Sequence, residues 1–479
     1  MVLLTSKLLL LASTTVSIGA VTAKVTNTHK SVTINHVSYH KVECIERDVV
    51  VVGGGSSGTY AAIGLIDAKK SVAVIDNHDR MGGHTNTYKD PTTGHTEDYG
   101  VMVFHDIDLV KQYAARLNVT LALNDRFNST ASTVYADFRT GIQNSTYSTS
   151  IDALTTGFER YAAQLQKYPY VETGFDLPSP VPEDLLLCFG DFAIKYQLGN
   201  EFVAFLFSFA QGLGDFLSKP TLYVFKNVGM GVLENFNAGF LSTPAHDNSL
   251  IYKNAQGIIG EENVFLNSKI VAVNRSGHCA QVLISTPSGY KFIDAKKLVF
   301  TIPPKIHNLA GWDLSASEKT LFSQFNSSGY YSGVFGNTGL PTGVSVMNVA
   351  DNTPYGLPPL PAGYIISSTA IPKVFNLYFG SPTSLTDDDV RAAMLAELHK
   401  LRIANMTDSY PKLLAYARHE PFELWVPAEA IAAGFYRELY GLQGQRNTFY
   451  TGAAFHTHDS SLLWEFTEAL IPKITASLS

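Results

Sequence analysis

The segment DVVVVGGGSSG, residues 48–58, sets the fold of this 479-residue chain. Its four consecutive valines are apolar on both faces, which is typical of a buried strand in a parallel sheet. The glycines end that strand, and residues 57–68 have the composition of a helix with small side chains. Residues 71–75 form a second apolar stretch, which ends in Asp76. We therefore predict a βαβ unit of about 30 residues at the start of a Rossmann-like domain.

The glycine turn has the spacing G-x-G-x-x-G in the context that gives this motif its meaning. Gly53 permits a tight turn, Gly55 leaves the backbone open to a pyrophosphate, and Gly58 allows helix and strand to pack closely. The helix N-terminus attracts anions, and Asp76 can accept hydrogen bonds from a ribose. The alternative is a structural turn with a solvated aspartate. The predicted contacts to an adenine dinucleotide are Gly53, Gly55, Ser56, Ser57, Gly58 and Asp76.

Composition places the chain among ordinary globular proteins. Hydrophobic residues make up 45% and charged residues 16%, a balance that excludes a disordered chain. The net charge is −7 and no basic cluster is present, which argues against nucleic acid as a partner. The length is sufficient for two or more domains.

Further segments resemble the flavin amine oxidoreductase superfamily. Residues 76–85, DNHDRMGGHT, resemble its E-x-x-x-R-x-G-G-R/H-T segment, and residues 98–104, DYGVMVF, resemble its D-x-G stretch beside the isoalloxazine. Residues 265–273 are similar to the strand that contacts adenine through its backbone. Residues 449–453, FYTGA, are similar to the strand and glycine that close the FAD site. Within the superfamily, the chain most resembles the fungal β-cyclopiazonate dehydrogenase group.

The resemblance implies FAD as the cofactor and an α/β fold. The FAD-binding Rossmann-like domain, of the glutathione-reductase or amine-oxidase type, would be interleaved with a mixed α+β substrate domain. A helix beginning near Ser461 would stabilise negative charge on the reduced flavin. His84 stands where many relatives have arginine, and it also offers an atom for covalent attachment, so the flavin linkage stays open. The further implied FAD contacts are Asn77, Arg80, Gly82, Gly83, His84, Thr85, Val101, Met102, Val103, Ile270, Gly452, Leu462 and Leu463.

Strand-rich and helix-rich stretches alternate along the chain, which predicts two discontinuous domains. We assign residues 24–46 to an extended leader. The FAD-binding domain would take residues 47–120, 241–304 and 441–479, and the substrate domain residues 121–240 and 305–440. Within these ranges the pattern predicts a strand over residues 265–273 and helices over residues 191–211 and 386–401.

Residues 1–23 read as a cleavable signal peptide. Lys7 precedes an apolar run to Ala20, and Ala23 and Ala20 both suit cleavage. The run is shorter than the about 20 residues of a bilayer span, so cleavage is favoured over a membrane anchor. No later stretch of the sequence could span a membrane. Glycosylation sequons agree with secretion, and they begin at Asn118, Asn128, Asn144, Asn274, Asn326 and Asn405.

The three cysteines, Cys44, Cys188 and Cys279, follow neither a metal-binding nor a disulfide-framework spacing. One pair could be bridged in an oxidising compartment, or all could be buried thiols. His456 and His458 form an H-x-H, but no further ligands are spaced nearby, so we predict no metal site. One of these histidines could line the active site and shuttle a proton, or both could be loop residues bonded to backbone.

The predicted function is a secreted FAD-dependent oxidoreductase acting on a small, partly apolar organic molecule, in line with the secondary metabolites of the resembled group. A hydride would pass to flavin N5, and oxygen or another acceptor would reoxidise the flavin. Residues 328–337 lack the lysine that amine oxidases place near N5, so amine oxidation is not predicted and the catalytic residues stay unassigned. The alternatives are a redox-neutral double-bond isomerase and a non-catalytic flavin- or ligand-binding protein.

Overall fold

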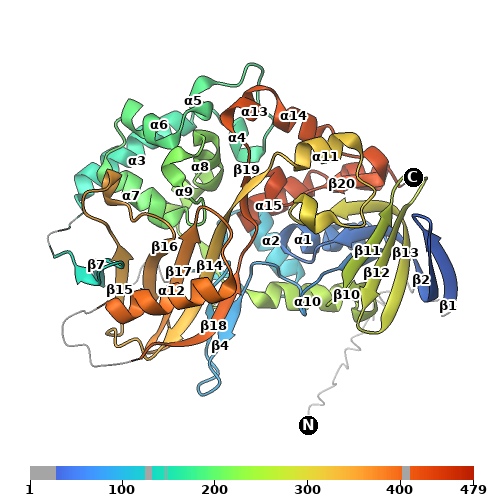
Figure 1. Cartoon of the computed structure of the whole chain (residues 1–479), viewed down its shortest axis with the longest axis horizontal. Coiled ribbons are helices and arrows are strands. Elements are labelled where there is room, and N and C mark those ends of the chain that lie inside the picture. The colour runs from blue at the N-terminus through green and yellow to red at the C-terminus, as the bar shows by residue number, and fades with distance from the viewer. Residues whose placement is uncertain (1–28, 125–131, 146, 148, 402–409, 479) are drawn as a thin grey trace, which may run out of the picture.

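The computed structural model describes residues 29–124, 132–145, 147, 149–401 and 410–478. Two eight-stranded sheets dominate the molecule, and helices cover them on several sides (Figure 1). The first sheet stands at the right of Figure 1 and the second at the left. The confirmed fold class is therefore a mixed α/β protein with a Rossmann-like domain.

The first sheet has the order β10-β3-β2-β13-β12-β11, with β1 added beside β2 and β20 beside β13. Strands β10, β3, β2, β13 and β20 are parallel, so the carboxyl ends of β2 and β3 meet at one edge. The bounds are β1 His29–Ile34, β2 Val37–Val52, β3 Val72–Ile75, β10 Val264–Phe265, β11 Lys269–Asn274, β12 Ala280–Thr286, β13 Gly289–Phe300 and β20 Thr448–Tyr450.

The βαβ unit is confirmed, with α1 at Ser56–Asp67 between β2 and β3. The strand predicted at residues 48–52 is only the last part of β2, which begins at Val37. The preceding residues, assigned to a leader, pair with β1 on one side and β13 on the other. Only Val42 and Ile45 are buried among residues 37–46, so the continuous apolar run that reveals the buried end is absent there.

Helices α1, α2, α10, α15 and α16 share one hydrophobic core with the first sheet. Trp464 lies at its centre with no exposed surface, stacks on Phe104 with ring centroids 5.2 Å apart, and meets Tyr113 edge-on at 4.7 Å. This packing fixes α15 against α1, beside the edge where β2 and β3 end. The bounds are α2 Asp108–Arg116, α10 Ser249–Ile259, α15 Ser460–Glu468 and α16 Ile471–Ala476.

The second sheet has the order β18-β14-β17-β16-β15-β7-β8, with β19 beside β14. One face packs on α12 (Asp387–Lys400), and the opposite face joins a large aromatic core shared with helices α3 to α9, between residues 151 and 238 (Figure 1). The strands are β7 Ser132–Asp137, β8 Ile142–Gln143, β14 Asn326–Gly336, β15 Val344–Asn348, β16 Ala362–Ser368, β17 Val374–Ser381, β18 Lys412–Arg418 and β19 Phe422–Trp425. Two short pairs complete the strands: β4 Thr87–Lys89 with β5 Thr96–Asp98, and β6 Ala122–Leu123 with β9 Leu241–Ser242.

The remaining helices cover the second sheet and the gap between the sheets. They are α3 Ile151–Leu165, α4 Tyr170–Thr173, α5 Glu183–Leu186, α6 Phe189–Lys195, α7 Asn200–Phe209, α8 Thr221–Asn227, α9 Met230–Ala238, α11 Ala316–Phe322, α12 Asp387–Lys400, α13 Ala428–Ala432 and α14 Phe435–Tyr440. The helix predicted over residues 386–401 is confirmed as α12, and its N-cap Thr386 accepts a hydrogen bond from the Asp389 N–H.

Two predicted elements are wrong because the chain breaks within them. The helix predicted over residues 191–211 is interrupted between α6 and α7, where Gln197 and Gly199 have φ of 51° and 83°. The strand predicted over residues 265–273 is divided into β10 and β11, with Asn267 at φ 49° between them. Positive φ ends both types of regular structure, and the apolar pattern on either side conceals such a break.

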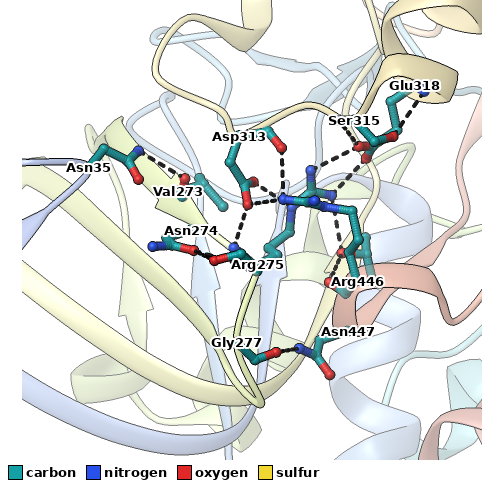
Figure 2. A network of polar contacts seen from close by, with 12 residues as sticks. Asn35, Val273, Asn274, Arg275, Gly277, Asp313, Ser315, Glu318, Arg446 and Asn447 are labelled. Carbon is teal, nitrogen blue, oxygen red and sulfur yellow. Dashed lines mark hydrogen bonds and ion pairs between the residues drawn. The ribbon is translucent and has the colours of Figure 1, made fainter.

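A buried ion network ties the first sheet to the segment before α11 and to β20 (Figure 2). The side chain of Arg275 is fully buried, and it pairs with Asp313 at 2.8 Å and with Glu318 at 2.8 Å. The Glu318 carboxylate accepts a further hydrogen bond from the Tyr450 hydroxyl at 2.5 Å. Because Tyr450 ends β20, this network fixes the strand that leads into Gly452 and the cavity described below.

The structure corrects the expectation for the cysteines. All three are free thiols, so no pair is bridged, and none is buried, since Cys188 is exposed and Cys44 and Cys279 are half-buried. Within the part of the chain that the structure describes, no helix combines the length and apolar character needed to cross a bilayer. The predicted domain boundaries stay a prediction.

Candidate functional site

A cavity of about 580 Å³ opens at the carboxyl ends of β2 and β3. This edge of a parallel sheet is where α/β proteins bind ligands, and the volume lies within the usual range of about 300–1,000 Å³ for such sites. Residues from the ends of β2 and β3, the 82–85 loop, the start of β11 and the 418–424 segment line its walls. Residues of both sheets and of the segments that adjoin them therefore line the cavity.

The floor of the cavity is bare backbone. The Gly82 N–H donates to the Gly54 carbonyl at 2.8 Å, which brings the two glycine-containing loops together. A Cβ built on Gly83 would lie 3.0 Å from the Gly55 Cα, and one built on Gly55 would lie 3.7 Å from the Gly83 Cα. Side chains at these positions would fill the space that a diphosphate needs against the backbone.

Gly58 has a different role from its neighbours, because it does not line the cavity. A Cβ at this position would lie 1.9 Å from the Gly53 carbonyl oxygen, a separation that no side chain can adopt. Only glycine lets α1 pack so closely on the end of β2, as the motif predicts. The close approach holds the N-terminus of α1 at the cavity.

Hydroxyl groups gather at the N-terminus of α1 and on the 82–85 loop. Ser56, Ser57 and Thr85 line the cavity, and the Tyr252 hydroxyl interacts with those of Ser56 and Thr85, whereas no described residue bonds to the buried Ser57 hydroxyl. Buried polar groups are nearly always satisfied in a functional protein. The first turn of α1 also lacks acidic residues, so a phosphate would meet donors and a favourable dipole. These groups fit the diphosphate of FAD.

Asp76 lies at the end of β3 and lines the same cavity. Its Oδ2 accepts a hydrogen bond from the Gly54 N–H at 2.7 Å, and its Oδ1 accepts one from the His78 N–H at 2.8 Å. These bonds orient the carboxylate but do not exhaust its lone pairs. The arrangement leaves Asp76 able to accept hydrogen bonds from a ribose.

The imidazole rings of His84 and His458 line the wall toward the second sheet. His84 lies between His458, at a ring-centroid separation of 5.8 Å, and His419, at 5.0 Å. Burial, with the charges of His78 and Arg80, lowers the pKa of His84 to about 4. Burial likewise brings the pKa of His419 and His458 well below the ordinary value, and His84 contributes to both shifts. All three rings are therefore neutral at pH 7.

Helix α15 begins beside the cavity, where Ser460 and Leu463 line the wall. Its N-cap, Asp459, accepts hydrogen bonds from the Ser461 and Leu462 N–H groups at 2.8 and 3.0 Å. Asp459 also pairs with His105 at 3.2 Å. Burial alone would raise the pKa of Asp459, but the charge of His105 holds it below the ordinary value. The carboxylate that caps α15 is therefore held in its charged form at the N-terminus of the helix.

The structure brings most of the predicted cofactor contacts to one place. The predicted residues that line the cavity are Gly53, Gly55, Ser56, Ser57, Asp76, Asn77, Gly82, Gly83, His84, Thr85, Val101, Ile270, Gly452 and Leu463. Their role in binding FAD stays a prediction, but residues from segments that are far apart in the sequence line the same cavity.

Besides Gly58, four predicted contacts lie outside the cavity lining. Arg80 donates instead to the Asn86 side chain at 2.5 Å and braces the glycine loop. Met102 accepts a hydrogen bond at its sulfur from the Tyr378 hydroxyl, and Val103 packs on the aromatic core. The Leu462 N–H is taken by the Asp459 cap, and its side chain is buried. These four residues pack against or hydrogen-bond to neighbouring residues outside the cavity lining.

Several lining residues were not predicted. Some of them adjoin predicted positions: Ser268 and Lys269 precede Ile270 in the chain. Their place within the strand predicted over residues 265–273 is the only feature of the sequence that indicates them. Others, such as Pro303, Trp312 and Leu424, belong to segments without a motif. For the H-x-H, the structure separates the two histidines: His458 lines the cavity, whereas His456 is buried against Phe466 with ring centroids 5.6 Å apart.

Comparisons with known proteins agree with this geometry. A family model described as an NAD(P)-binding Rossmann-like domain matches residues 51–117. The FAD-dependent oxidoreductase oblC of Cochliobolus heterostrophus is 40% identical over 470 residues, which cover 95% of this chain and 97% of that protein. The β-cyclopiazonate dehydrogenase of Aspergillus oryzae is 33% identical over 443 residues, covering 91% and 94%.

Solved structures share the fold at lower identity. A conjugated-linoleic-acid-producing fatty acid isomerase from P. acnes superposes with a TM-score of 0.72 at 19% identity, covering 89% of this chain and 98% of that one. The cyclohexylamine oxidase of Brevibacterium oxydans superposes with a TM-score of 0.64 at 16% identity, covering 90% and 98%. At these identities the likeness concerns the fold alone.

Proposed function

Because the chain belongs to the flavin amine oxidoreductase superfamily, in the group that includes β-cyclopiazonate dehydrogenase, we propose that it oxidises a small, partly apolar organic molecule, a secondary metabolite in class. The chain is an FAD-dependent enzyme of this family, which sets aside the non-catalytic alternative. The observation that supports the proposal most is the cavity itself. It combines a bare glycine floor, buried hydroxyls at the N-terminus of α1 and neutral imidazole rings in one space.

Each part of the cavity has a task in this proposal. The backbone at Gly55 and Gly83 and the hydroxyls of Ser56, Ser57 and Thr85 would hold the diphosphate of FAD, and Asp76 would hold the adenosine ribose. Bound FAD supplies the hydride acceptor. Ile302, Pro303 and Leu424 give the cavity an apolar surface, from which water is excluded and on which an apolar substrate can rest.

Residues of β14 bear on the type of substrate. The strand carries no lysine, and the ring of its Tyr330 stacks on His419 with centroids 5.3 Å apart, while the Tyr330 hydroxyl donates to Gln211 at 2.8 Å. Ser332 of the same strand contacts the His419 Nε2 at 3.0 Å. β14 thus carries no cationic side chain, and the proposal does not extend to amine oxidation.

The flavin itself tests the proposal. The purified protein should show flavin absorbance, and a metabolite that is a substrate should bleach this absorbance without oxygen and release hydrogen peroxide or reduce another acceptor when one is admitted. Absence of flavin from every preparation, even after FAD is added, would contradict the proposal. Sustained anaerobic turnover without any acceptor would support the double-bond isomerase instead.

We also propose that the protein is secreted and N-glycosylated. The signal peptide at residues 1–23 and the sequons at Asn128 and Asn405 lie outside the described residues. Of the other sequons, Asn118 and Asn326 are exposed, and Asn144 and Asn274 are half-buried. We expect a eukaryotic host to export a protein that begins at Lys24 or Val21 and shifts in mass on deglycosylation. An Asn118→Gln variant should lose one glycan, and an intracellular protein that retains Met1 would contradict the prediction.

A further inference from the structure

His458 occupies a defined position on the wall of the cavity. Its ring lines the cavity and packs on Phe422, with ring centroids 3.9 Å apart and planes inclined by 28°. The His84 ring lies on it with planes only 7° apart. Two aromatic neighbours therefore hold the imidazole in one orientation.

One ring nitrogen of His458 has a fixed role. The Glu423 N–H donates a hydrogen bond to Nε2 at 3.0 Å, so this nitrogen is an acceptor and carries no proton. Glu423 has φ of 41°, in the left-handed region that residues other than glycine rarely adopt. Such strained residues concentrate at functional sites. In a neutral imidazole whose Nε2 accepts, the proton is on Nδ1.

The charged groups around His458 do not favour an imidazolium. The Glu423 carboxylate accepts a hydrogen bond from the Asn227 amide at 3.2 Å, and Asp459, the next residue in the chain, pairs with His105. The other titratable neighbours are imidazoles, His84 in contact with the ring and His419 beyond it. Burial lowers the pKa of His458 well below its ordinary value, and His84 adds to the effect. A general base normally has the opposite surroundings, a carboxylate that stabilises its protonated form.

We propose that His458 is a catalytic residue that presents its Nδ1–H to the cavity as a neutral hydrogen-bond donor, and not a base that shuttles protons. The donor would bind an electronegative atom of the substrate, so the preferred substrates carry a carbonyl or similar acceptor next to the C–H bond that is broken. A preorganised donor of this kind stabilises negative charge that develops during reaction. The inference rests on the proposed function, but the position of the proton can be tested without it.

The tautomer can be measured directly on the purified full-length protein, whether or not flavin is bound. We expect ¹⁵N NMR of histidine-labelled protein to show one imidazole that is protonated on Nδ1 and does not titrate between pH 5 and 8. Its signal is identified by its absence from a His458→Asn variant. An Nε2–H tautomer, or a ring that takes up a proton in this range, would overturn the proposal whether or not a substrate has been found.

Two substitutions separate a donor from a merely structural ring. Asn places an N–H where histidine has Nδ1, whereas Gln places an acceptor where histidine has Nε2 and keeps the contact to Glu423. We expect His458→Gln to lower the rate of anaerobic flavin reduction by about 100-fold or more, the usual effect of losing a preorganised donor, and His458→Asn to retain most of it. The reductant is the metabolite identified by flavin bleaching and peroxide release.

His456→Asn is the matched control, because His456 lies outside the cavity lining. Its rate per bound flavin should equal that of the wild type. If His458→Gln retains the rate and His458→Asn loses it, the ring serves only to support Glu423 and the proposal fails. Absence of flavin in the wild type would instead contradict the proposed function and leave the NMR result standing.

Discussion

A Gly55→Val variant is expected to fold normally and to lose FAD. Gly55 has φ of −75° and ψ of −166°, a conformation that valine adopts without strain. The nearest atom to a Cβ at this position is the Gly83 Cα, at an ordinary contact distance of 3.7 Å. The added methyl groups would nevertheless occupy the floor of the cavity and hold the diphosphate away from the N–H groups of α1. We expect the dissociation constant for FAD to rise at least about 100-fold, equivalent to about 2.7 kcal/mol.

Flavin absorbance per mole of protein measures this loss, and circular dichroism with thermal unfolding of the apoprotein tests the fold. Gly257→Val is the matched control: it lies on α10, where a Cβ would meet nothing within 4 Å, so flavin content should not change. If Gly55→Val keeps its flavin, the diphosphate does not lie against this turn. If it unfolds as an apoprotein at a temperature where the wild-type apoprotein is stable, the substitution fails as a probe of binding. The same change at Gly83 then tests the opposite side of the floor.

The features of this site that form between residues close in the sequence could be predicted, because they depend on interactions between near neighbours in the chain. The valines of β2, the glycine turn and α1 follow one another directly, and close packing at Gly58 involves a backbone atom only five positions away. Residues 76–85 follow directly on β3, the last strand of the βαβ unit, and so lie at the same sheet edge. For these positions, the order along the chain already determines the order in space.

The wall toward the second sheet could not be predicted in this way. Leu424, which lines the cavity, and the strained Glu423 belong to β19, which pairs with β14 of the second sheet, and no motif marks them. Trp312 likewise enters the cavity lining from a segment between β13 and α11. The apolar character of these segments is equally suited to an ordinary core, so their role depends on tertiary packing that a linear pattern does not contain.

An Arg275→Met variant should be strongly destabilised, because it leaves the Glu318 carboxylate in the protein interior without its cation. Glu318 is 2% exposed, and Arg275 also holds the Asp313 carboxylate and contacts the Thr448 hydroxyl at 3.2 Å. Removing one partner of such a buried pair costs about 3–5 kcal/mol in the free energy of unfolding. Lys296→Met, which breaks a pair with Asp48 on the solvent-exposed side of β13, should cost no more than about 1 kcal/mol.

The pH dependence of this loss identifies its origin. Burial alone would raise the pKa of Glu318, but in the wild type the hydrogen bond and charge of Arg275 hold it below its ordinary value. A depressed carboxyl pKa stabilises the folded state above the ordinary pKa, and this stability is lost as the pH falls through the folded value. In Arg275→Met we expect the pKa of Glu318 to be raised instead, because burial, the largest influence on it, is then opposed only by the hydrogen bonds from the Tyr450 hydroxyl and the Ser315 N–H. The penalty for the stranded carboxylate is therefore present at pH 8 and fades on acidification. In urea unfolding, the difference in the free energy of unfolding between wild type and Arg275→Met should therefore narrow from pH 8 to pH 5. An Arg275→Met/Glu318→Gln double variant should be more stable at pH 8 than Arg275→Met. If the difference in the free energy of unfolding does not depend on pH, and the double variant is no more stable than Arg275→Met, then lost packing of the arginine side chain accounts for the destabilisation and the unpaired Glu318 charge does not.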